Sequence, residues 1–220
     1  MATSTLPAMG NYASGMTIHL NDNAGTIKAY GFDDMFPSDP TFGTAIAPSS
    51  GATPKGLTVQ HDLGGTTGLG VNNIYVGQDN GYIAPNDAVV LDFSSVNTTA
   101  TSGGQTGSLN QITFNLYEDR AGTDYEVYGL VSGTINTSSA VWAWIASGVM
   151  SNRTPLTVPT TALYNAYAIG VTDCALDIQG VQLQYAAVVT SQTPEPGTFV
   201  MAGMALIGLG VTMKRRGRKS

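Results

Sequence analysis

The chain of 220 residues contains little charge, two histidines and a single cysteine. Charged residues make up only 11% of it, unlike the Lys- and Glu-rich surface of a typical cytosolic enzyme. Cys174 has no partner for an intrachain disulfide, and we interpret it as a small buried residue. His19 and His61 lack the spacing of zinc ligands, which argues against a transition-metal site.

Motifs of the common catalytic classes are also missing from the sequence. It has no Gly-x-Ser-x-Gly segment. The stretch GGTTGLGVNN, with Gly68 and Gly70, has Asn73 at the third glycine position and no phosphate-binding Lys, so we interpret it as a turn. The neighbouring carboxylates Glu118 and Asp119 are expected on opposite faces of a strand. We therefore predict a non-catalytic protein without a cofactor.

Basic residues are scarce before the C-terminus. Four of them precede Thr193 against 14 acidic residues, which gives that part a formal net charge of −10. Such a surface repels the phosphates of nucleic acids, so we predict no nucleic-acid partner. The other five basic residues are Lys214, Arg215, Arg216, Arg218 and Lys219.

Short runs of alternating apolar and polar residues recur along residues 1–190, separated by Gly, Asn, Asp and Pro. In QITFNLYED, for example, Ile112, Phe114 and Leu116 fall on one face of a strand. No sustained helical periodicity occurs there. The pattern predicts an all-β domain, an antiparallel β-sandwich of jelly-roll type.

Two local features refine this picture. In ALDIQGVQLQYAA the apolar phase changes between Ile178 and Val181, which predicts a β-bulge or a bent strand at Gly180. The stretch NTTATSGGQTGS at 97–108 has almost nothing to bury, so we predict a mobile surface loop.

The stretch VWAWI contains the only two tryptophans of the chain, Trp142 and Trp144. In a strand both indoles lie on one face. With that face outward they form a candidate platform for stacking on sugar rings, and with it inward they are core residues. The core interpretation is favoured because large aromatic side chains are usually buried.

The stretch DNGYIAPND gathers oxygen-bearing side chains in one predicted loop: Asp79, Asn80, Asn86 and Asp87. Oxygen ligands of this kind suit a weak calcium site, although the spacing of an EF-hand is missing. A solvated turn held by Asx hydrogen bonds explains the same residues and is favoured.

The C-terminal segment TPEPGTFVMAGMALIGLGVTMKRRGRKS differs from everything before it. The 18 residues from Pro196 to Met213 carry no formal charge. As a helix they span about 27 Å, close to the roughly 30 Å of a bilayer core. The basic residues that follow favour a cytoplasmic end. We predict an exported domain at 1–190, a linker at 191–197, a transmembrane helix at 198–213 and a cytoplasmic tail at 214–220.

The order of Pro194-Glu195-Pro196, an apolar run and a basic end resembles the PEP-CTERM sorting signal of exopolysaccharide-producing bacteria. The resemblance implies recognition by an exosortase, an integral-membrane cysteine-dependent transpeptidase, and processing near the Pro-Glu-Pro. These residues are then the recognition site of a substrate and not an active site. Such proteins also carry a signal peptide, which MATSTLPAMGNYASG does not resemble, so we expect an upstream start or removal of the leader.

Taken together, the sequence predicts an exported, non-catalytic protein of the cell envelope or extracellular matrix. We expect a precursor anchored in the inner membrane and a mature form at the cell surface or in the matrix. Its expected partners are an exosortase, the membrane and extracellular polysaccharide. Two alternatives remain: a carbohydrate-binding module that uses the tryptophan strand and the acidic loops, and a secreted hydrolase.

Overall fold

The chain divides into two units, Met1–Ala187 and Val188–Ser220. The computed structural model describes residues 1–33, 35, 45–46, 53–55, 57–61, 67–71, 83, 87–102, 105–118, 122–135, 139–151, 153–159, 163–171 and 176–187. All of these lie in the first unit. The predicted linker, transmembrane helix and basic tail therefore fall outside the described residues.

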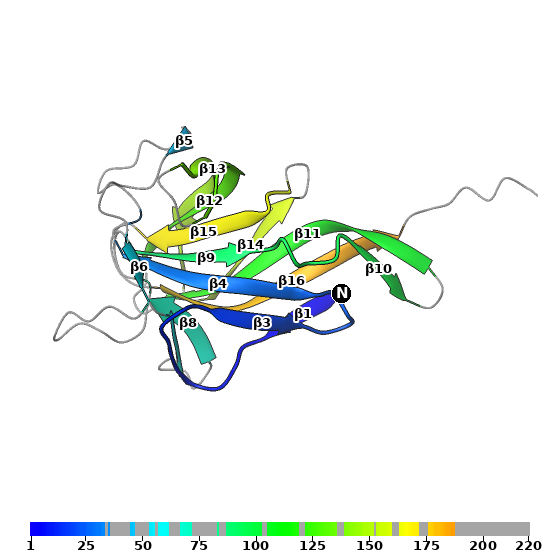
Figure 1. Cartoon of the computed structure of the whole chain (residues 1–220), viewed down its shortest axis with the longest axis horizontal. Coiled ribbons are helices and arrows are strands. Elements are labelled where there is room, and N and C mark those ends of the chain that lie inside the picture. Colours follow the sequence, from blue (N-terminus) through cyan, green and yellow to red (C-terminus); the bar gives the residue numbers. More distant parts are fainter. Residues whose placement is uncertain are drawn as a thin grey trace, which may run out of the picture. The chain divides into compact units, whose positions relative to one another are not determined.

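The described part is an all-β antiparallel sheet, which confirms the predicted fold class (Figure 1). Its strands form two halves, here named half A and half B. Half A consists of β2 (Gly10–Tyr12), β7 (Leu57–His61), β8 (Thr67–Val71), β10 (Thr99–Ser102), β11 (Gln105–Glu118), β14 (Arg153–Pro159) and β16 (Leu176–Ala187). Half B consists of β3 (Met16–Leu20), β4 (Thr26–Asp33), β5 (Ala45–Ile46), β6 (Thr53–Lys55), β9 (Ala88–Asp92), β12 (Asp124–Ser132), β13 (Val141–Val149) and β15 (Ala166–Val171).

The strand β1 (Ala2–Thr5) joins the two halves into one sheet. Ala2 and Thr3 pair with β16 of half A, whereas Ser4 and Thr5 pair with β3 of half B. The continuous sheet curls strongly, as a half-barrel does, so that one face of each half lines a shared core. This strand order gives no support to the finer jelly-roll assignment.

The first core lies between the two halves. Phe114 of β11 packs edge-to-face against Phe93, just after β9, and against Tyr167 of β15, with ring centroids 6.2 and 5.5 Å apart. Ile112 and Leu116 flank Phe114 on the same face, each 1% exposed. The inward face predicted for QITFNLYED is thus confirmed. Burial of these apolar side chains is the main contribution that holds half A to half B.

Half B is buried on its other face as well. Val90 of β9 belongs to a second core, while its neighbours Val89 and Leu91 point into the first. The second core gathers the following buried residues: Phe32, Met35, Ala88, Val90, Tyr128, Ala140, Trp142, Ala166 and Ala168. A strand that is buried on both faces has a continuous apolar sequence, such as AVVL here, and not an alternating one.

The predicted irregularity near Gly180 is confirmed as a β-bulge. Asn115 of β11 pairs with Gly180, but the next residue, Leu116, pairs with Ile178. The extra residue on β16 is therefore Gln179, and it changes the phase of the strand so that Val181 returns to the core.

Two sequence interpretations were wrong. The predicted loop at 97–108 holds a hairpin, in which β10 pairs with the start of β11 from Thr99↔Ser108 to Ser102↔Gln105. The hydroxyls of Thr101 and Thr106 also lie 3.3 Å apart across it. The glycine-rich stretch around Gly68 is not a turn but β8, which pairs with β7 and β16.

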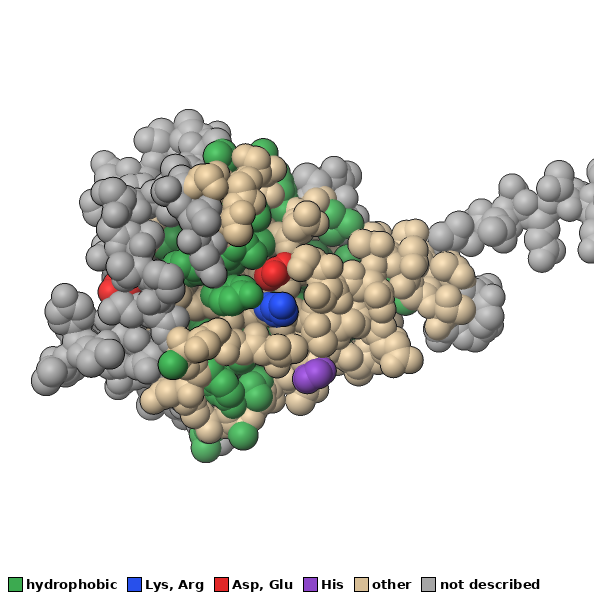
Figure 2. Space-filling model, viewed as in Figure 1, with side chains coloured by type: hydrophobic (Ala, Val, Ile, Leu, Met, Phe, Trp, Pro, Cys, Tyr) green, Lys and Arg blue, Asp and Glu red, His purple; other side chains and the backbone are tan. Residues whose placement is uncertain are grey.

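Few charged side chains are visible on the described face of the first unit in Figure 2. This agrees with the low charge content of the sequence. Among the described residues, no helix has the length and apolar character needed to cross a membrane.

Candidate functional site

The two tryptophans lie on the outer face of half B, in the second core. Trp144 of β13 pairs with Tyr128 of β12, and Trp142 pairs with Leu130. Trp142 is 0% exposed and Trp144 is partly buried. In this structure Trp142 therefore cannot stack on a sugar at the surface, and the pair does not form an exposed platform.

A carboxyl group lies buried in the same layer. Glu126 is 1% exposed, and its Oε2 accepts a 2.6 Å hydrogen bond from the hydroxyl of Tyr128. Among the described residues, neither its Oε1 nor the Nε1 atoms of Trp142 and Trp144 have a hydrogen-bond partner. Burial raises the pKa of Glu126, the Tyr128 hydroxyl opposes that shift, and the carboxylate of Asp124 adds to it. The net shift is upward, so Glu126 ionises at a higher pH in the fold than in the unfolded chain.

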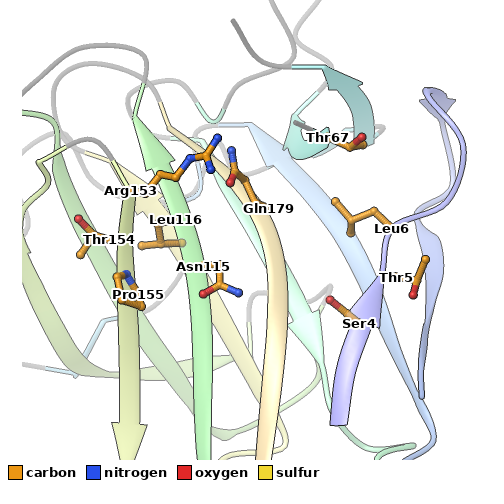
Figure 3. Close-up of a pocket in the computed structure, with 10 residues that line it drawn as sticks. All are labelled: Ser4, Thr5, Leu6, Thr67, Asn115, Leu116, Arg153, Thr154, Pro155 and Gln179. Atoms are coloured by element: carbon orange, nitrogen blue, oxygen red, sulfur yellow. The ribbon is translucent and has the colours of Figure 1, made fainter. Parts of the chain in front are cut away.

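Half A has an open groove of about 720 Å³ beside the bulge of β16 (Figure 3). It lies where β1 leaves β16 and crosses to half B. Its polar lining comprises Ser4, Thr5, Thr67, Asn115, Arg153, Thr154 and Gln179. Its apolar lining comprises Leu6, Leu116 and Pro155.

The bulge on β16 shapes the floor of this groove. A Cβ added to Gly180 would lie 3.3 Å from Ser4 Oγ and 3.9 Å from Asn115 Nδ2, so only bare backbone separates these two side chains. The Ser4 Oγ accepts a 2.8 Å hydrogen bond from the Val181 N–H. That bond satisfies a backbone donor at the bulge and fixes β1 along one wall.

Among the described residues that line the groove, Arg153 is the only formally charged one. Its guanidinium lies over the ring of Tyr117, with Cζ 5.7 Å from the ring centroid. The two residues are cross-strand partners on β14 and β11. This contact orients the guanidinium at the end of the groove where Gln179 also lies (Figure 3).

Comparison with known protein families matches residues 192–216 to the PEP-CTERM protein-sorting motif. The chain carries a PEP-CTERM motif. Neither the curated proteins nor the solved structures contain a significant match to this chain. The match confirms the resemblance drawn from Pro194, Glu195 and Pro196, and a protein with this motif is exported and processed by an exosortase.

The residues of the PEP-CTERM motif lie outside the described part, as do the five basic residues that end the chain. Three members of the predicted calcium loop, Asp79, Asn80 and Asn86, lie outside it too. The fourth, Asp87, is 1% exposed. Within the described ranges, no group of three or more His, Cys, Asp or Glu side chains is placed to hold a metal ion.

The groove was not predicted from the sequence. The alternation in QITFNLYED already places Asn115 on the outward face of its strand. Which strands lie beside β11, however, depends on pairings between distant segments, and Ser4 lies 177 residues from Val181. Local patterns carry no signal for such pairings.

Proposed function

We propose that this chain is a non-catalytic protein of the cell envelope or extracellular matrix, delivered by its PEP-CTERM motif. The observation that carries the proposal is the motif at 192–216, which follows a single compact β unit. In this proposal the β unit is the exported part, and the C-terminal segment serves sorting.

The burial of three of the described carboxyl groups is consistent with a non-catalytic role. Asp87, Glu126 and Asp177 are each at most 1% exposed. A substrate at the surface does not reach them in this conformation. General acid–base catalysis requires a group within hydrogen-bond reach of the substrate.

For the C-terminal segment, the proposal is a single transmembrane helix at 198–213 with a cytoplasmic tail at 214–220. The run from Gly197 to Met213 carries no charge, and the five cations after it favour retention on the cytoplasmic side. The precursor is then anchored in the inner membrane, and the processed form belongs to the cell surface or matrix.

The orientation is tested with spheroplasts that hold the unprocessed precursor with an epitope after Ser220. External protease is expected to digest the β unit and to leave the epitope intact. Protection of the β unit in intact spheroplasts, with digestion only after lysis, would contradict export. A cytoplasmic protein in the same cells controls for leakage.

Carbohydrate binding is the second candidate function. The buried Trp142 does not support the tryptophan platform as its site. The groove of half A favours this function instead, because its lining is rich in hydroxyl and amide groups.

A further inference from the structure

The geometry points to the groove of half A as a binding site for a neutral polysaccharide. The proposed function supplies the matrix setting, whereas the choice of ligand rests on the groove itself. Its volume of about 720 Å³ lies within the roughly 300–1,000 Å³ of common ligand sites.

The groove exists because two neighbours of β16, the strands β1 and β8, part at one place. β1 pairs with Gln182 and Leu183, while β8 pairs with Ile178. Between these pairings, no residue of the bulged segment 179–181 is a registered strand partner of β1 or β8 among the described residues. Ser4 of β1 and Thr67 of β8 line the groove beside β16, and residues of β11 and β14 line the rest of it.

The lining has the hydrogen-bonding chemistry that hydroxyl-rich ligands need. The side chain of Asn115 carries an amide donor and an amide acceptor on one planar group, which suits a pair of neighbouring sugar hydroxyls, and Gln179 adds a second amide to the lining. The guanidinium of Arg153 presents several donors in a fixed fork. Hydroxyl side chains in the lining add groups that can both donate and accept.

Apolar lining supplies the rest of the contact. Pro155 projects from β14 into the floor, and Leu6 lies on the wall that follows β1 (Figure 3). Sugar rings present C–H faces beside their hydroxyls, so a groove with both kinds of surface matches them. A purely hydrophobic ligand would desolvate the polar lining without replacing its contacts with water, which is costly.

Charge selects a neutral polymer over an acidic one. Arg153 is the only charged residue in the described lining. The chain before Thr193 carries a formal net charge of −10. A long polyanion would gain one favourable contact at Arg153 and meet repulsion over the rest of the surface.

The test measures binding of the full-length protein, in detergent, to a fixed panel of polymers by affinity electrophoresis and calorimetry. The neutral members are dextran, mannan, galactan and xylan, and the acidic ones are alginate and polygalacturonate. We expect at least one neutral polymer to bind. Gln179→Ala and Asn115→Ala should weaken that binding about tenfold or more, which corresponds to about 1.4 kcal/mol.

The matched control is Gln184→Ala. Gln184 has the same side chain on the same strand, is exposed, and lies outside the groove. It should bind like the unchanged protein. Gly180→Ala is a second variant that adds one methyl group between Ser4 and Asn115, and it should also weaken binding. An unchanged melting temperature shows that the fold of a variant is intact. If Gln179→Ala and Asn115→Ala unfold, Gly180→Ala provides the test.

Three outcomes would overturn the inference. The first is that no neutral polymer binds, and the second is that binding persists in all groove variants. The third is binding of acidic polymers alone, lost in Arg153→Ala, which would make the groove an anion site. None of these bears on sorting, because processing of the PEP-CTERM motif is measured separately.

Discussion

The hydroxyl of Tyr128 donates a 2.6 Å hydrogen bond to Oε2 of Glu126 inside the second core. Within the described part of the chain, the other oxygen of Glu126, Oε1, has no hydrogen-bond partner. Burial raises the pKa of Glu126 above its ordinary 4.5. The folded protein therefore binds this proton more tightly than the unfolded chain does. Its contribution to the free energy of unfolding is fully present below pH 4.5 and is lost as the pH rises through the raised pKa.

The substitution Glu126→Gln should remove this loss of stability at high pH. At pH 8 we expect its free energy of unfolding to exceed that of the unchanged protein by about 1–3 kcal/mol, because a buried charge is replaced by a neutral group. The measurement is urea denaturation between pH 4 and 8. Asp22→Asn, which removes an exposed carboxylate, should change little. A destabilised Glu126→Gln at pH 8 that kept the original pH slope would contradict the account.

Removing the partner hydroxyl should have the opposite effect. Tyr128→Phe takes away the hydrogen bond to Glu126 but keeps the buried ring. We expect a loss of about 1–3 kcal/mol at neutral pH, and a smaller loss below the ordinary pKa of Glu126, where the acid is neutral in both states. If the loss of stability did not vary with pH, it would come from changed packing alone and not from the charge of Glu126.

The burial of Trp142 predicts a fluorescence signature. Trp144→Phe leaves Trp142, which is 0% exposed, as the only tryptophan. We expect its emission to be blue-shifted in the folded protein and resistant to iodide quenching, and both properties to vanish in urea. Trp142→Phe leaves the partly exposed Trp144 and should be quenched more readily. Emission of Trp142 that iodide quenches as strongly in the folded as in the unfolded protein would contradict its burial.

The close approach of Tyr164 to β12 predicts that Gly129 tolerates no side chain. A Cβ added there would overlap the Tyr164 ring. Gly129→Ala should cost about 1–3 kcal/mol of stability, as overpacking does in a well-packed core. Gly148→Ala is the control, because its nearest neighbour is the Tyr125 hydroxyl at 3.0 Å, the far end of a side chain. Equal denaturation midpoints for both variants would argue against the contact.

Calcium should not stabilise the protein. Asp87 is 1% exposed, and the interpretation of its neighbourhood as a polar turn is favoured over a metal site. A ligand that binds only the folded state raises its stability by RT ln(1 + [L]/Kd). We therefore expect the same melting temperature in millimolar calcium and in chelator. A rise with calcium, abolished in Asp87→Ala, would establish the site.

The sequence predicted those features that depend on local alternation. Ile112, Phe114 and Leu116 lie on the predicted face because side chains alternate along any strand. The bulge at Gly180 was predictable for the same reason, since it interrupts that alternation. The C-terminal motif was recognisable because its three unlike parts occur in a fixed order along the chain.

Features that depend on distant pairings were missed. Val90 looks like a residue of an ordinary strand, and only the second core reveals that both faces of β9 are covered. The strand β14 begins at Arg153 and contains Pro155. Proline is unfavourable inside most strands, so the neighbouring sequence alone does not predict a strand here. Its described pairing is with β11 alone, and proline is tolerated in a strand at the edge of a sheet.

The central claim is that the PEP-CTERM motif delivers this protein through an exosortase, and one immunoblot tests it most directly. Pro194, Glu195 and Pro196 are replaced together by alanine, and the membrane and released fractions are compared in hosts with and without the exosortase. The unchanged protein should be converted to a shorter form only where the enzyme is present. The alanine variant should stay at full length in the membrane fraction in both hosts. Conversion of the alanine variant at the normal rate would contradict the account.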